Sequence, residues 1–184
     1  MSFEFKLKTE SVNKLHDDVV RIFNKVLSNE QMMNEIGKAV VTDIQVKTKK
    51  GYSIPNNSSF KPLTRSWINR RKKLAEVNPV DEAYGPSKSN LTFTGDLLRS
   101  IIFKIIGKGK LEFDFEGDHE PYGNLNGEPS GSAIKNKTLA GYVAAAGRPF
   151  FGLSRAVQLK TNSIVKKYMN RALKVQKLLK NIDN

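Results

Sequence analysis

Acidic and imidazole side chains gather near the middle of the chain, where they form the densest group able to do metal or acid–base chemistry. Asp114, Glu116, Asp118, His119 and Glu120 fall within one short stretch. Because carboxylates and imidazole bind divalent metals, one hypothesis is a metal-dependent nuclease that uses Asp114, Asp118, His119 and Glu120. The favoured interpretation is a polar hairpin end that runs into a loop, where acidic residues are common. We therefore predict no catalytic residue and no metal ligand in this chain.

Other signatures of catalysis are missing from the sequence. There is no cysteine, which excludes thiol catalysis, disulfides and cysteine-bound zinc. The second histidine, His16, stands beside Asp17 and Asp18 in a helical pattern and is expected on a solvated face. Neither a nucleophile elbow nor a dinucleotide fingerprint is present, and residues 107–110 lack the spacing of a phosphate loop. The sequence predicts a protein that is not an enzyme and needs no cofactor.

Positive charge is the strongest chemical signal in the composition. The 31 Lys and Arg residues exceed the 18 Asp and Glu residues, which gives a net charge of +13. Such a charge favours an anionic partner, either nucleic acid or an acidic protein face. One acid-free stretch holds Lys61 and the candidate contacts Arg65, Arg70, Arg71, Lys72 and Lys73. A solvated helix face is an equally good interpretation, and it is favoured for the basic C-terminal run. Aromatic residues do not interleave with these cations, so base stacking is not expected.

Apolar residues at helical spacing predict two consecutive helices in the first part of the chain. A short alternating stretch at residues 3–8 precedes them and has strand periodicity. Ser28 followed by Gln31 resembles a capping box that opens the second helix, so a bent helix or a tight helical pair is expected. The predicted inner faces comprise Val12, Leu15, Val19, Ile22 and Val26, then Met33, Ile36, Val40 and Ile44.

Polar segments rich in Gly, Pro and Asn predict two mobile loops, at residues 47–61 and 117–137. Another loop is expected at residues 77–90. Between the first two loops, Pro62 is expected in the first turn of a third helix. One side of that helix is marked by Leu63, Trp67 and Leu74.

A hairpin and a long helix are predicted in the second half of the chain. Residues 101–106 and 111–116 flank a Gly/Lys turn, and apolar and acidic residues alternate in the second run. The apolar run at residues 139–146 is predicted to be a strand or a buried turn. Helical spacing then continues from Ser154 through Val157, Ile164, Tyr168, Val175 and Leu179. Together these elements predict one α+β domain over residues 1–184, with N-terminal helices and a long C-terminal helix packed on a small antiparallel sheet. No apolar run is long enough to span a membrane.

Three segments, in this order, resemble the motifs of a known family. Residues 60–64, Phe-Lys-Pro-Leu-Thr, resemble an aromatic-x-Pro-Leu-Ser/Thr element before a basic helix. Residues 91–101 resemble a Leu…Thr-Gly-x-Leu-x-x-Ser-Ile element, and residues 148–154, Arg-Pro-Phe-Phe-Gly-Leu-Ser, resemble an element that opens a last helix. Together they are similar to the Mu-like phage virion-morphogenesis, or tail-completion, family, and the Thr-Gly element is similar to that of lambda-like neck and tail-component proteins. Residues 122–127 match only in part the family's Tyr-Ala…His-x-x-Gly element.

The motif residues are expected to act mainly in structure. They are Pro62, Leu63, Thr94, Gly95, Leu97, Ser100, Arg148, Pro149 and Phe150. Thr94 is expected to cap a short helix, Gly95 to allow close packing, and Ser100 to satisfy a local backbone group. Arg148 is the exception, because we expect it to pair with a carboxylate across a subunit boundary.

The resemblance implies a structural virion protein of a tailed phage, acting in tail completion, in the neck or as a tail terminator at the head–tail junction. It implies a homo-oligomeric, six-fold ring assembled in the host cytoplasm. The expected partners are head–tail adaptor or neck proteins and tail tube or sheath proteins, with genomic DNA in the channel as a further candidate contact. The alternatives are a sequence-nonspecific nucleic-acid-binding protein outside a virion and the metal-dependent nuclease described above.

Overall fold

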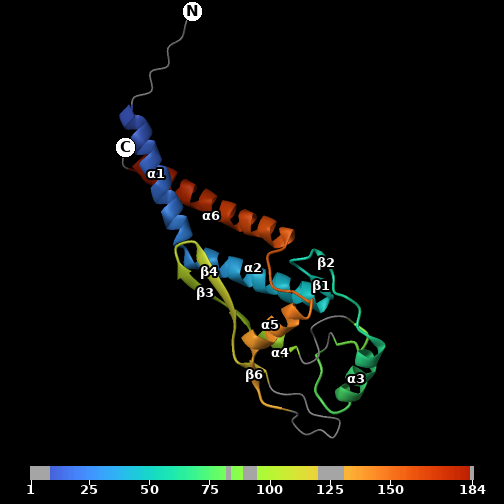
Figure 1. The fold of residues 1–184 in the computed structure, drawn as a ribbon. Coiled ribbons are helices and arrows are strands. Elements are labelled where there is room, and N and C mark those ends of the chain that lie inside the picture. Colours follow the sequence, from blue (N-terminus) through green and yellow to red (C-terminus); the bar gives the residue numbers. More distant parts are fainter. Residues whose placement is uncertain (1–8, 82–83, 89–94, 120–130, 183–184) are drawn as a thin grey trace, which may run out of the picture.

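The computed structural model of the chain describes residues 9–81, 84–88, 95–119 and 131–182, with the backbone alone at 9–12, 15 and 177–182. These residues form six helices and three two-stranded antiparallel sheets, which confirms the predicted α+β class (Figure 1). The strand expected at residues 3–8 lies outside the described residues. Among the helices that are described, none is both long and apolar enough to cross a membrane.

Two N-terminal helices, α1 (Thr9–Leu27) and α2 (Glu30–Lys49), meet at a short break, which fits the bent helix or tight helical pair expected there. Asn29 caps α2, because its side chain accepts a hydrogen bond from the Met32 backbone N–H at 2.8 Å. The capping box expected at Ser28 is therefore wrong by one residue. The Ser28 hydroxyl instead donates to the Asn24 carbonyl oxygen at 2.8 Å, within the last turn of α1. The predicted inner face of α2 is confirmed, with Met33, Ile36, Val40 and Ile44 buried.

The core lies where α2 meets α6 (Arg155–Ile182) and the hairpin of β3 (Ile101–Gly107) and β4 (Lys110–Phe115). The predicted hairpin is confirmed, in a register that pairs Ile101 with Phe115 and Ile105 with Leu111. From α6, the buried residues of the predicted face are Val157, Ile164 and Tyr168, whereas Val175 is exposed. Leu179 lies outside the described side chains.

The segment at residues 47–61 is more regular than the expected loop. Its first three residues complete α2, and β1 (Tyr52–Ser53) then pairs with β2 (Ser58–Ser59). Ile54 and Phe60 are buried. The Ser53 hydroxyl donates to the Pro149 carbonyl oxygen at 2.6 Å, so this small hairpin is tied to the segment before α6.

The segment at residues 117–137 also contains regular structure. In it β5 (Asp118–His119) pairs with β6 (Ile134–Lys135), and α5 (Asn136–Ala145) begins. Helix α5 corrects the strand or buried turn expected at residues 139–146. The run is rich in alanine, which favours a helix. Leu139 and Val143, four residues apart, pack toward the core, whereas Tyr142 is exposed.

Helix α3 (Arg65–Ala75) begins later than expected, because Thr64 caps it by accepting a hydrogen bond from the Trp67 backbone N–H at 3.3 Å. Pro62 therefore precedes the helix instead of lying in its first turn. Leu63 and Leu74 are buried. The helix lies far from the free end of α1, at the opposite end of the molecule (Figure 1).

Candidate functional site

The second motif forms the turn that leads into the β3–β4 hairpin. The short helix α4 (Asp96–Arg99) has Gly95 at its N-cap position, with φ of 80°. A side chain at this position would collide with the carboxylate of Asp81. Both the backbone conformation and the close approach therefore require glycine, as the expected packing role implied. Thr94, the expected cap, lies outside the described residues.

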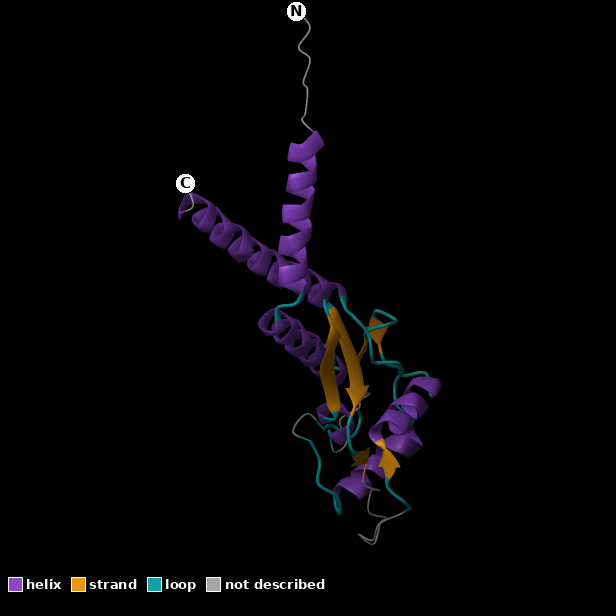
Figure 2. Cartoon of the chain, turned by 90° about the vertical axis from the view of Figure 1, so that its left-hand side faces the viewer, coloured by secondary structure: helices purple, strands orange, loops and turns teal. Residues whose placement is uncertain are grey.

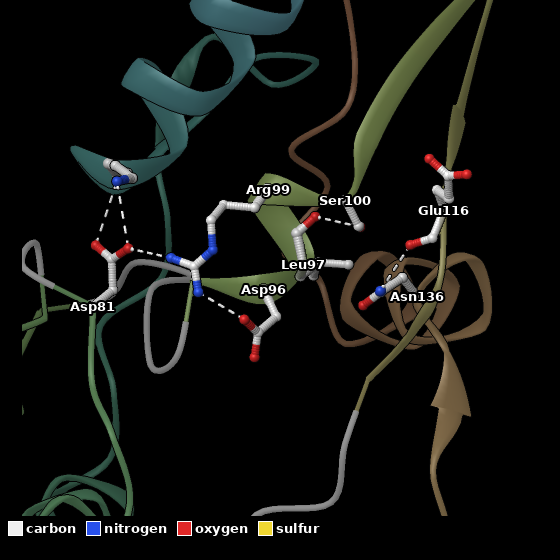
Figure 3. A network of polar contacts seen from close by, with 8 residues as sticks. Asp81, Asp96, Leu97, Arg99, Ser100, Glu116 and Asn136 are labelled. Carbon is white, nitrogen blue, oxygen red and sulfur yellow. Dashed lines mark hydrogen bonds and ion pairs between the residues drawn. The ribbon is translucent and has the colours of Figure 1, made fainter.

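Asp81 is the centre of a polar network around this turn (Figure 3). Its side chain is only 4% exposed and forms ion pairs with Lys49 Nζ at 3.4 Å and Arg99 Nη1 at 3.1 Å. Arg99 also pairs with Asp96 at 2.6 Å. A buried carboxylate is stable only when such partners offset its lost hydration. Asp81 therefore ties the end of α2 to α4, a role that no motif in the sequence indicates.

Ser100 and Asn136 continue the polar contacts toward the hairpin. The Ser100 hydroxyl donates to the Leu97 carbonyl oxygen at 2.9 Å, which confirms the expected local role. The Asn136 side chain donates to the Glu116 carbonyl oxygen at 3.0 Å and joins α5 to the end of β4 (Figure 3). Leu97 is buried between these contacts and the core. These positions act in structure, as expected for the motif.

The third motif anchors the start of α6. Phe150 is buried, and its ring meets that of Phe115 edge-on, with 6.0 Å between centroids. The Pro149 carbonyl oxygen accepts the hydrogen bond from Ser53. At the start of the helix, the Ser154 hydroxyl accepts a hydrogen bond from the Val157 backbone N–H at 3.2 Å. The motif thus fixes the long helix to the hairpin and to β1.

Arg148 joins the third motif to the first. Its guanidinium donates to the Lys61 carbonyl oxygen at 3.4 Å, and partial burial lowers its pKa. No carboxylate pairs with Arg148 within the described part of the chain. The expected pairing across a subunit boundary requires a second copy and stays a prediction.

The described acidic and histidine side chains of residues 114–119 do not form a metal centre. Asp114 accepts a hydrogen bond from the Phe115 backbone N–H at 2.9 Å and pairs with Lys137 at 3.0 Å, and both contacts lower its pKa. His119 is buried, whereas Asp118 is exposed. A search of the described residues finds no group of three potential metal ligands, and Glu120 lies outside them. Asp114 therefore serves the contact between the hairpin and α5.

The candidate basic contacts divide into two kinds. Arg71 is buried, its guanidinium lies over the Tyr84 ring at 4.9 Å, and it donates to the Lys88 carbonyl oxygen at 2.8 Å. Its assignment as a partner contact is corrected, because it holds the segment at residues 84–88 against α3. The other four candidates are exposed: Arg65, Arg70, Lys72 and Lys73.

An aromatic ring does accompany these cations, contrary to expectation. Arg70 lies over the ring of Trp67, 5.5 Å from its centroid, and Trp67 is 43% exposed. Trp67 and Arg70 are three residues apart, a spacing that makes neighbours on a helix, so the helix predicted over this segment already allowed the pair.

Exposed apolar side chains follow one side of α1. Val19 is 50%, Val20 42% and Phe23 47% exposed, whereas Val26 is buried. The inner face expected for α1 is therefore confirmed at Val26, which is buried, and at Ile22, which packs partly buried against the core, and is wrong at Val19. The side chains of Val12 and Leu15 are outside the described set. The cause is that α1 projects away from the rest of the molecule in both views (Figures 1 and 2). Contiguous exposed apolar surface commonly marks a site of association.

Comparison of the chain with protein-family models, curated proteins and solved structures found no match. The function must therefore be inferred from the residues and their geometry.

Proposed function

We propose that the protein is a structural component of a tailed phage virion that completes the tail and joins it to the head, and that it has no catalytic role. The observation that carries the proposal is the meeting of the three family-like motifs in one scaffold. Arg148 of the third motif binds the Lys61 carbonyl of the first. The second motif leads directly into Ile101, which pairs with Phe115, and Phe115 packs on Phe150 of the third.

This scaffold supports a structural role because its polar groups hold segments of the chain together. Asp81 ties α2 to α4, and Asn136 ties α5 to β4. Asp114, one of the four residues of the alternative nuclease, forms an ion pair with Lys137. Each of these contacts positions an element, and the described residues include no group of three potential metal ligands.

Assembly into a ring is the second part of the proposal. A ring with rotational symmetry needs two different complementary surfaces on each subunit. Two exposed apolar patches meet this need: Val19, Val20 and Phe23 on α1, and Phe151 with Leu153 before α6. They lie on different elements, since Phe151 and Leu153 come just before α6 and the α1 patch lies on a helix that contacts α6. Such an arrangement suits head-to-tail contact between successive copies.

The proposal is tested first on purified protein, by sedimentation velocity and negative-stain electron microscopy. We expect closed rings, six-fold as the resemblance implies, with a central channel. Protein that stays monomeric at every concentration contradicts the ring.

A genetic test addresses the joining role. Deleting the reading frame should leave filled heads and tails that are released separately, and supplying the protein should restore joined particles. Joined particles in its absence, or particles without this protein by mass spectrometry, contradict the proposal.

A nucleic-acid-binding protein outside a virion is the second candidate, favoured by the exposed cations of the acid-free helix α3. Mass spectrometry of purified virions separates the two candidate functions, because only a structural component is present in the particles.

A further inference from the structure

The outward face of α3 is lined by hydrogen-bond donors. Positions that are four, seven or eight residues apart share one face of a helix, and Arg65, Asn69, Lys72 and Lys73 have this spacing. All four side chains are exposed. Arg71 and Leu74, three residues apart, are buried on the other side. The helix therefore turns its packing side inward and presents a row of cationic and amide groups to the solvent.

These cations are not neutralised within the described part of the chain. The side chains of Arg65, Lys72 and Lys73 form no hydrogen bond or ion pair there. Lys137 and Lys167, by contrast, each bind a carboxylate. Like charges on one face of a helix repel one another. An anionic partner bound to this face would reduce that repulsion and so stabilise the helix.

The other basic helix, α6, has a different surface. Its cations are interrupted by exposed apolar side chains, with Leu159 62% and Leu173 44% exposed. Lys167 is also engaged by Glu35. A mixed apolar and cationic face suits contact with protein, whereas the face of α3 consists of donors alone. A partner that carries regularly spaced anionic oxygens therefore fits α3 better than α6.

We propose that α3 binds the phosphate backbone of duplex DNA through Arg65, Lys72 and Lys73, without reading the base sequence. Asn69 and Ser66 supply neutral donors beside them. Side chains of these types make most protein contacts to DNA phosphates, and an α-helix fits the width of the major groove. In Figure 1, α3 lies at the edge of the molecule, at the end opposite the free end of α1. The proposal does not depend on the head–tail assignment.

The test is a fluorescence anisotropy titration of a labelled, mixed-sequence DNA duplex. The binding variant is Arg65→Ala, Lys72→Ala, Lys73→Ala. The matched control is Arg155→Ala, Lys160→Ala, Lys166→Ala, which removes the same charge from exposed positions on α6. We expect the α3 variant to lose on the order of tenfold or more in affinity, and its salt slope to fall by roughly three, since each phosphate contact contributes about 0.9. The control should stay close to the wild type.

The single tryptophan of the chain reports on the fold of α3. Trp67 is seven residues from the buried Leu74, so the two share the packing side of the helix, away from Arg65, Lys72 and Lys73. Its fluorescence in the absence of DNA should therefore match that of the wild type in both variants. Thermal melts by circular dichroism establish that both variants are folded before binding is compared.

Several outcomes overturn the proposal. Equal loss of affinity in both variants means that net charge, and not α3, binds DNA. Displacement of the duplex by polyglutamate at equal charge concentration means that α3 binds acidic protein. The same variants are examined for ring assembly, so that lost DNA binding with normal assembly, or the reverse, separates this proposal from the head–tail role.

Discussion

Gly95 combines a left-handed backbone with close packing against Asp81, and both features disfavour any other residue. Its φ is 80°, and a Cβ atom at this position would meet the Asp81 carboxylate. We predict that Gly95→Ala lowers the free energy of unfolding by about 2–4 kcal/mol, because backbone strain adds to the displacement of a buried carboxylate. Urea denaturation followed by circular dichroism measures the change.

Gly141→Ala is the matched control for this substitution. Gly141 lies within α5, and an added Cβ would meet nothing within 4 Å. Because glycine weakens a helix interior, we expect this variant to gain up to about 1 kcal/mol. Equal stability of the two variants would contradict the role given to Gly95.

Asp81 offers a second prediction at the scale of one residue. Asp81→Asn keeps the shape of the side chain but removes the charge that faces Lys49 and Arg99. We expect a loss of about 1–3 kcal/mol in stability, since both cations are partly solvated and retain some hydration. The more exposed Asp96→Asn should cost less than half as much. If Asp96→Asn lowered the stability more than Asp81→Asn, Asp81 would not be the centre of the polar network.

Arg71 is expected to affect stability and not binding. Its guanidinium is buried against Tyr84 and the Lys88 carbonyl, so Arg71→Ala should lower the free energy of unfolding by about 2–3 kcal/mol. At a temperature where the variant is folded, its affinity for duplex DNA should match that of the wild type. Reduced DNA affinity in fully folded Arg71→Ala protein would show that Arg71 contributes to DNA binding and is not only structural.

At the scale of elements, α2 and α6 are joined at the surface by one ion pair. Lys167 Nζ lies 3.0 Å from Glu35 Oε2, and this hydrogen bond lowers the pKa of Glu35 below its ordinary value. A lowered carboxyl pKa stabilises the fold above the unfolded value, about 4.3, and the contribution is lost as the pH falls through the folded pKa. Glu35→Gln should therefore be less stable than the wild type at pH 7, and the difference should shrink in acid.

Glu112→Gln serves as the control for this pH dependence. Glu112 is exposed on β4 and forms no ion pair with another described residue. Urea denaturation at neutral pH and well below the ordinary glutamate range should show a pH-dependent difference for Glu35→Gln alone. A constant difference for Glu35→Gln would mean that the ion pair does not contribute.

Elements with a strong period were predictable from sequence, and those defined by distant contacts were not. The inner face of α2 and the β3–β4 alternation follow from local periodicity, and both are confirmed. The run at residues 139–146 is short and apolar, and such a run fits a strand or a helix equally well by periodicity alone. The alanine content of the run favours the helix α5, and the Asn136 side chain fixes the start of that helix to the end of β4.

The candidate site shows the same division. Gly95 and Ser100 were assigned correct local roles because the turn that they form is encoded within a few residues. The structural roles of Arg71 and Asp81 were not identified, because each depends on contacts with other parts of the chain: Arg71 with residues 84–88, and Asp81 with α2 and α4. Neighbouring cations such as Arg70 and Arg71 are alike in sequence, and only packing separates the exposed side chain from the buried one.

At the scale of the whole molecule, the packed core and the projecting helix α1 differ in how far their apolar side chains are buried. The core residues of α2, α6 and the hairpin bury one another. On α1, by contrast, Val19, Val20 and Phe23 remain exposed within a helix that extends from the body (Figure 2). Leaving such side chains in water forgoes the gain of burial, roughly 1.5–3 kcal/mol for each fully buried side chain. A second copy that covered this stripe would recover part of that gain, which is the physical reason to expect assembly through α1.

Phe23→Asp tests assembly directly. An aspartate within an apolar interface loses hydration without gaining a partner, at a cost of several kcal/mol. We predict that the dissociation constant of the ring rises on the order of a hundredfold or more, as measured by sedimentation velocity over a range of concentrations. The monomer fold should persist, because Phe23 is half exposed in the single chain.

Lys14→Gln changes the charge by the same amount at an exposed position on a different side of α1 and should assemble normally. Rings that form equally well from both variants would show that the α1 stripe is not an interface, and would direct attention to Phe151 and Leu153.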